Sequence, residues 1–116
     1  MEHLKAPNFE ATNWTTILGW YEQLYQIQPS PFNLLNQVMV QLQLSKYEEA
    51  LKLLQQINPK DLEQRAYLFH GSYAEYLVLT GKAKSALKSI DTALELVKNE
   101  AERQILLKKK YDTVSY

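Results

Sequence analysis

The sequence predicts an all-α fold, arranged as a short right-handed stack of antiparallel helical hairpins with about six helices. Apolar residues recur at steps of three and four along most of the 116 residues, as they do on one face of an α-helix. Only three glycines and four prolines are present, and there is no sustained apolar–polar alternation and no Asn-Gly or Asp-Gly turn of a β-hairpin. One stretch of the chain also repeats 36 positions later.

Prolines and capping residues mark the first helix. Residues 1–12 show no period and contain Pro7, so we expect an arm or the end of a linker there. Asn13 is a good N-cap for a first helix, and Pro29 disfavours helical geometry before it, so this helix should stop near Gln28.

The next two helices follow directly. Ser30 and Pro31 are typical of an N-cap and a first helical position, and they predict a second helix that runs to about Leu44. Ser45 is expected to cap a third helix, which ends at Asn58-Pro59.

Glycine and asparagine divide the rest of the chain. A fourth helix is expected over about Asp61 to Thr80, with Gly81 as the break before a fifth. Asn99 and Glu102 resemble a capping box for a sixth helix, which reaches about Tyr111. The predicted helical domain therefore covers residues 13–111, and residues 112–116 form a C-terminal tail.

Ala50 and Ala86 mark the internal repeat. The segments around the two alanines align with one gap. The first segment is Leu-Ser-Lys-Tyr-Glu-Glu-Ala-Leu, and the second is Leu-Thr-Gly-Lys-Ala-Lys-Ser-Ala-Leu. Leu54 and Ile90 follow four residues later in each unit. A small residue on the second helix of a hairpin lets the paired helix approach, and the large residue fills the space behind it. This is the pattern of tetratricopeptide (TPR) repeats.

The first helix of each hairpin fits the pattern less evenly. Ala74 supplies the expected small residue in the second unit, whereas Met39 takes that place in the first. Two hairpins are too few for a free-standing solenoid, so the first and sixth helices should cover the ends. We expect Trp14 and Tyr21 of the first helix in the core, together with the large residues of the repeat. A plain helical bundle is the alternative fold.

Composition excludes several classes of function. Lys and Arg total 13 and Asp and Glu total 13, so the basic excess of a duplex-binding protein is missing and we expect no direct nucleic-acid binding. Cysteine is absent, which excludes disulfides and thiolate metal sites. No apolar run reaches the roughly 18 residues that span a bilayer, and the N-terminus lacks the apolar core of a signal peptide. We expect a cytoplasmic protein without a membrane partner.

No motif predicts chemistry. His3 and His70 are the only histidines and lack metal-ligand spacing, and neither a phosphate-binding Gly-rich loop nor a nucleophile elbow is present. We therefore expect no catalytic, cofactor or metal site, and no enzyme. His70 lies among Tyr67, Phe69 and Tyr73, which favours a packed histidine; a small enzyme or ligand-binding protein that uses this histidine is the remaining alternative.

A groove is the predicted functional surface, because the first helices of TPR hairpins line the concave side and hold a peptide or a neighbouring domain. The candidate residues are Asn33, Asn36, Gln37, Gln41, Tyr67, His70, Gly71 and Tyr73. The competing interpretation is that several of them only tie helices together.

Five short motifs, in order, carry a family resemblance. They are Glu2-His-Leu-Lys-Ala-Pro7, Thr12-Asn-Trp-x-x-Ile17, Tyr21-x-x-Leu24 followed by Pro29-Ser-Pro-x-x-x-Leu-Asn36, Gly81-Lys82 with Ala86, and Asn99-x-Ala-Glu-Arg-x-x-Leu106. Over nearly its whole length the chain resembles the TPR-like C-terminal extension of a group of bacterial extracytoplasmic-function sigma factors. The family has Arg where this chain has Gln37.

The resemblance implies a non-catalytic regulatory module that modulates transcription initiation through contact with sigma core regions or RNA polymerase. It also implies that this chain covers only the tail, because the promoter-reading regions are missing from it. The alternative is a free-standing TPR-like adaptor that binds an unrelated peptide.

Overall fold

The computed structural model describes the backbone of residues 5–114 and the side chains of residues 14–114. In this part of the chain the fold is all-α, without strands. The elements are α1 (Lys5–Ile27), α2 (Pro31–Gln43), α3 (Tyr47–Gln56), the 3-10 helix η2 (Pro59–Arg65), α4 (Tyr67–Leu79), α5 (Ala83–Leu96) and α6 (Glu100–Val114). His3 lies outside the described residues.

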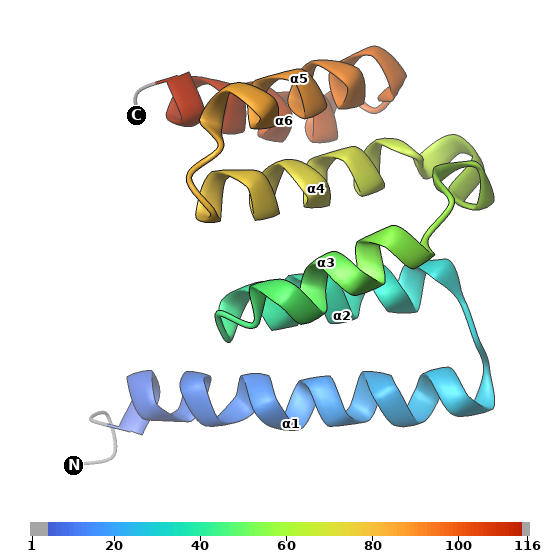
Figure 1. Cartoon of the computed structure of the whole chain (residues 1–116), viewed down its shortest axis with the longest axis vertical. Helices are drawn as coiled ribbons and strands as arrows, with labels where there is room; N and C mark the ends of the chain where they lie inside the picture. Colours follow the sequence, from blue (N-terminus) through green and yellow to red (C-terminus); the bar gives the residue numbers. More distant parts are fainter. Residues whose placement is uncertain (1–4, 115–116) are drawn as a thin grey trace.

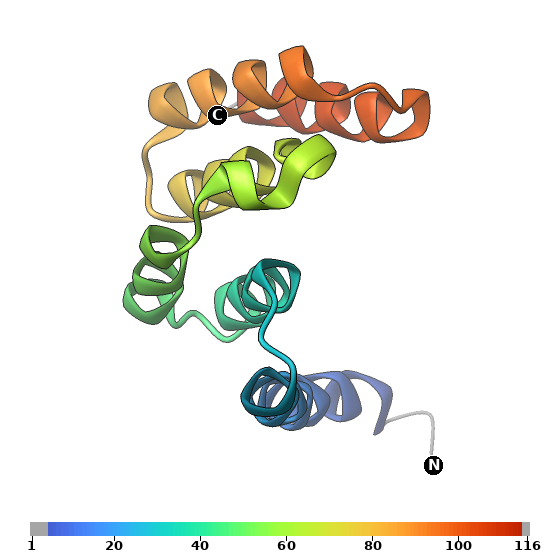
Figure 2. The ribbon, with the colours of Figure 1, turned by 90° about the vertical axis from the view of Figure 1, so that its right-hand side faces the viewer.

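The helices form a layered stack (Figure 1). The hairpins α2–α3 and α4–α5 pack as units, α1 packs on α2, and α6 packs on α5. Contacts of α4 with both α2 and α3 join the two hairpins. In Figure 2 the chain follows an arc from α1 at the bottom to α5 and α6 at the top. The predicted stack of antiparallel helical hairpins is therefore confirmed.

The repeat alanines lie where the TPR pattern predicts. Ala50, Ala74 and Ala86 are fully buried, and so is Ile90, while Leu54 is exposed by only 1%. All five belong to one apolar cluster that runs through both hairpins. Small side chains at these positions let the helices approach closely, and the larger ones fill the space that remains.

The N-terminal end differs from expectation. The first helix begins at Lys5 and not at Asn13, so residues 5–12 are helical and do not form an arm. Pro7 falls in the first turn, where an N–H would have no intrahelical partner, and it is therefore tolerated. Trp14 and Tyr21 are half-buried, and among residues 14–27 of this helix Leu18 is buried in their place.

Several turns also differ. Ser45 does not cap α3, because its backbone is left-handed (φ 61°) and Lys46 is the N-cap. Asn58 does not simply end a helix: its side chain accepts a hydrogen bond from the N–H of Lys60 at 3.0 Å and caps η2. The predicted fourth helix is consequently divided, with a break at Glu63 (φ 54°).

Other boundaries are confirmed. The hydroxyl of Ser30 accepts a hydrogen bond from the N–H of Phe32 at 3.2 Å and caps α2. Oδ1 of Asn99 accepts one from the N–H of Glu102 at 3.0 Å, at the start of α6. That helix continues to Val114, so residues 112–114 are helical, and only 115–116 of the expected tail lie outside the described residues.

Candidate protein-binding groove

The candidate site is a groove along α4, between α2 and α6. It consists of three adjoining hollows that are open to solvent. Met39, Leu68 and Ser72 line both the first hollow, beside α2, and the second, beside α6. Ile105 and Lys109 line both the second and the third. Because neighbouring hollows share their walls, they form one continuous surface, which we call the α4 groove.

The walls of the α4 groove are largely apolar. Met39 and Leu68 are half-buried, and Ile105 is 56% exposed. Phe32, Leu35 and Val78 extend the apolar lining at the two ends. Partly exposed aliphatic side chains in a concave surface are the usual lining of a peptide-binding groove.

Gly71 lies on the floor of the groove. It is buried, and Cδ2 of Leu106 would be 3.6 Å from a Cβ built on it. This distance is an ordinary van der Waals contact, so the side chain of an alanine would also fit here.

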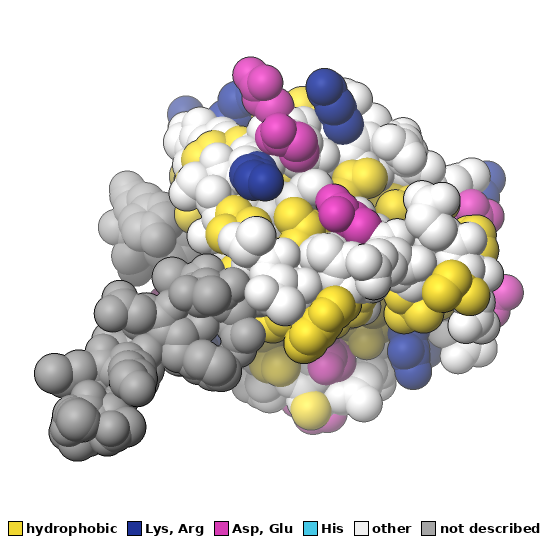
Figure 3. Space-filling model, turned by 90° about the horizontal axis from the view of Figure 1, so that it is seen from below, with side chains coloured by type: hydrophobic (Ala, Val, Ile, Leu, Met, Phe, Trp, Pro, Cys, Tyr) yellow, Lys and Arg dark blue, Asp and Glu magenta, His cyan; other side chains and the backbone are white. Residues whose placement is uncertain are grey.

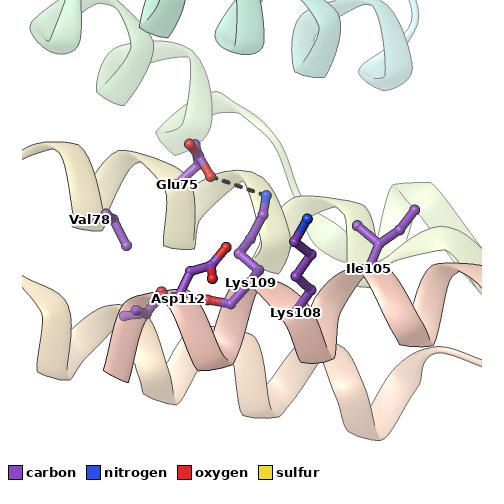
Figure 4. A pocket seen from close by; sticks show the side chains of 7 residues that line it. Glu75, Val78, Ile105, Lys108, Lys109 and Asp112 are labelled. Atoms are coloured by element: carbon purple, nitrogen blue, oxygen red, sulfur yellow. Dashed lines mark hydrogen bonds and ion pairs between the residues drawn. The ribbon is translucent and has the colours of Figure 1, made fainter. Parts of the chain in front are cut away.

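Charged side chains surround the third hollow (Figure 4). Nζ of Lys109 lies 3.1 Å from Oε1 of Glu75 and links α6 to α4 across it. Lys108 and Asp112 also line this hollow. In the described part of the chain, neither of them has an ion-pair partner within 4.0 Å, so both charges are available to a bound segment.

The other end of the groove is basic and aromatic. The guanidinium of Arg65 lies over the ring of Phe32, with 5.8 Å between its Cζ and the ring centroid. Both residues line the first hollow. A cation over an aromatic ring at an exposed site contributes about 0.5–1 kcal/mol, which orders this wall.

Three of the predicted groove residues line the α4 groove. Asn36 is exposed in the first hollow, and Tyr67 and Gly71 line the second. Sequence reasoning missed the neighbouring Ser72 and the whole contribution of α6. The step of four between Ile105 and Lys109 is the signal that could have placed both on one face of α6.

Asn33, Gln37 and Gln41 lie elsewhere. They are buried and line none of the described hollows. The apolar face of α2 belongs to the cluster shared with α3 and α4, and these amides lie on the remaining buried face of the helix. Oε1 of Gln41 has no hydrogen-bond partner there. The hydrogen bond from Nε2 of Gln37 to Oδ1 of Asn33 lies within α2, so it does not tie one helix to another.

His70 and Tyr73 face away from the groove. On a helix with 100° per residue they lie on the side opposite Leu68 and Ser72. The ring of His70 packs edge-on against Phe69, with 5.2 Å between centroids, and burial lowers the pKa of its imidazole from 6.5. Neither residue lines a described hollow, so the alternative of a polar pocket centred on His70 gains no support from the geometry.

Comparisons with protein-family models, with curated proteins and with solved structures found no match to this chain. No helix among residues 5–114 combines the length and the apolar character that crossing a bilayer requires.

Proposed function

We propose that this chain is a non-catalytic protein-interaction module that binds an apolar segment of another polypeptide in the α4 groove. The observation that carries the proposal is the continuity of the three hollows, with Met39, Leu68 and Ile105 partly exposed along them. We expect partly exposed apolar side chains in a groove to make the main contacts with a bound segment, because a few side chains supply most of the binding energy of an interface.

For the identity of the partner, we propose that it is a sigma core region or RNA polymerase, and that the chain is a regulatory tail of an extracytoplasmic-function sigma factor in the bacterial cytoplasm. Support comes from the ordered motif set, from Thr12-Asn-Trp near the start to Asn99-x-Ala-Glu-Arg near the end. The TPR-like stack agrees with the kind of fold that the resemblance implies. Docking in the groove would bias the sigma factor between active and inactive states.

A titration with the separate sigma core tests this proposal. We expect the core to bind the chain, and we expect Ile105→Glu and Met39→Glu to weaken binding by about tenfold or more, the cost of an interface hot spot. Leu96→Glu is the matched control, because Leu96 is also exposed but lines none of the described hollows. Absence of binding, with promoter-directed transcription unaffected by deletion of the tail, would contradict the proposal.

A free-standing adaptor is the alternative use of the same groove. The genomic sequence upstream of the codon for Met1 separates the two: a continuous reading frame that encodes a sigma core supports the regulatory tail, and a stop codon supports the adaptor. In the second case the same groove variants should reduce capture of an unrelated peptide.

A further inference from the structure

Helix α1 carries two apolar stripes. Trp14, Leu18, Tyr21 and Tyr25 recur at steps of four, three and four, and this stripe includes Leu18, the buried residue of the helix. Ile17, Trp20, Leu24 and Ile27 recur at steps of three, four and three. With 100° per residue the centres of the two stripes lie about 110° apart around the axis of α1. Since the first stripe contains the buried Leu18, the second stripe does not face α2. We call this second set the outer stripe.

Three of the four residues of the outer stripe are exposed in the structure, and Ile17 is half-buried. Trp20 is 63% exposed, Leu24 47% and Ile27 81%. The helix lies at one end of the stack (Figures 1 and 2), and the view onto that end shows hydrophobic side chains at the surface (Figure 3). A helix that is apolar on both sides normally has a partner on both.

The surroundings of the outer stripe carry almost no charge. Between Trp14 and Ser45 the sequence contains one charged residue, Glu22, while Lys46 to Tyr116 holds 22 of the chain's 26. Glu22 lies two positions after Trp20 and therefore about 200° around the helix from it. Depletion of charge together with an exposed Trp is typical of the core of a protein–protein interface.

We propose that the outer stripe is a self-association surface, on which α1 of a second copy of this chain packs antiparallel. Two features favour a second copy. The absence of charge gives no means to select an acidic or basic partner, whereas two identical uncharged faces meet without like-charge repulsion. The spacing of three, four and three residues is also the same from the N-terminus to the C-terminus as in the opposite direction. A two-fold axis at its centre therefore places Ile17 opposite Ile27 of the second copy, and Trp20 opposite Leu24.

The small size of the stripe predicts a weak affinity between the two copies. The four side chains of the stripe and their neighbours over residues 17–27 bury less surface than the roughly 800 Å² per partner of a standard stable interface. We therefore expect a concentration-dependent dimer with a dissociation constant between about 1 μM and 1 mM. Trp20 should be its central anchor, since Trp is enriched among hot spots.

Sedimentation velocity of the full chain from about 1 μM to about 1 mM tests the dimer. We expect the weight-average sedimentation coefficient to rise with concentration, and Leu24→Glu to abolish the rise. Leu96→Glu is the control, because Leu96 is the same residue type with a similar exposure, 40%, on a different helix. Far-UV circular dichroism of both variants verifies folding. A wild-type chain that stays monomeric at 1 mM overturns the proposal, as does an equal effect of the two substitutions, or a dimer that only Ile105→Glu in the α4 groove disrupts.

Cross-linking tests the direction of the pair. The chain has no cysteine, so Ile17→Cys and Ile27→Cys each introduce a single thiol. An equimolar mixture should form the mixed disulfide faster than either variant forms a disulfide with itself, because only antiparallel helices bring the two positions together. Preferential self-linking of Ile17→Cys would contradict the antiparallel arrangement.

Discussion

Nε2 of Gln37 donates a hydrogen bond of 2.8 Å to Oδ1 of Asn33, one turn earlier on α2, and both side chains are buried. This pair places two amide groups in the interior of the stack. A buried amide is tolerated when it is paired and costly when it is not.

A double-mutant cycle on this pair measures that asymmetry. Gln37→Met leaves Oδ1 of Asn33 buried without its donor, so we expect a loss of about 1–3 kcal/mol in the free energy of unfolding. Adding Asn33→Leu should recover most of the loss, because both partners are then apolar and similar in shape. Urea denaturation of the two single variants and the double variant gives the coupling energy. Strictly additive losses would show that the pair does not act as a unit.

The large repeat residues should dominate stability. Leu54→Ala or Ile90→Ala removes a side chain that is almost completely buried, and we expect each to reduce the free energy of unfolding by about 2–5 kcal/mol, through lost burial and the cavity left behind. Thermal and urea melts provide the measurement. Unchanged melts in both variants would refute the repeat register.

Two glycines should respond oppositely to alanine. A Cβ at Gly71 would meet Leu106 only at an ordinary 3.6 Å, so Gly71→Ala should stabilise α4 by up to about 1 kcal/mol through helix propensity. Gly81 has φ +80°, in the left-handed region, so Gly81→Ala should destabilise by about 1–2 kcal/mol. Differential scanning calorimetry of the two variants is the test, and melting-temperature shifts of the same sign would contradict it.

Stability should fall in mild acid because of His70. Burial holds the folded-state pKa of this imidazole below 6.5, so the unfolded chain binds the proton more readily than the folded one. Above pH 6.5 both states have a neutral imidazole and no penalty applies, whereas stability is lost as the pH falls below 6.5 through the folded-state pKa. His70→Gln, which cannot titrate, should flatten the dependence of Tm on pH between about 7 and 5. An identical slope in the variant would refute this contribution.

The all-α class, the repeat register and several helix ends could be predicted from patterns of neighbouring residues in the sequence. Ala50, Leu54, Ala86 and Ile90 are buried where the repeat predicts, since the packing of neighbouring hairpins depends on side-chain size at fixed spacing. Ser30 and Asn99 cap their helices as predicted, because a cap bonds only to residues two or three positions later. Local geometry is enough to fix such features.

The sequence does not show which polar residues line a groove and which are buried. Asn36 and Gln37 are adjacent in sequence, yet the first lines the α4 groove and the second is buried. The difference depends on the directions from which α1, α4 and α6 approach α2, and these are set by contacts between helices distant in the chain. The contribution of Ile105 to the groove has the same origin. The periodicity of apolar residues predicts which residues share a face of one helix. Contacts between helices that are distant in the chain determine which helix packs against each face.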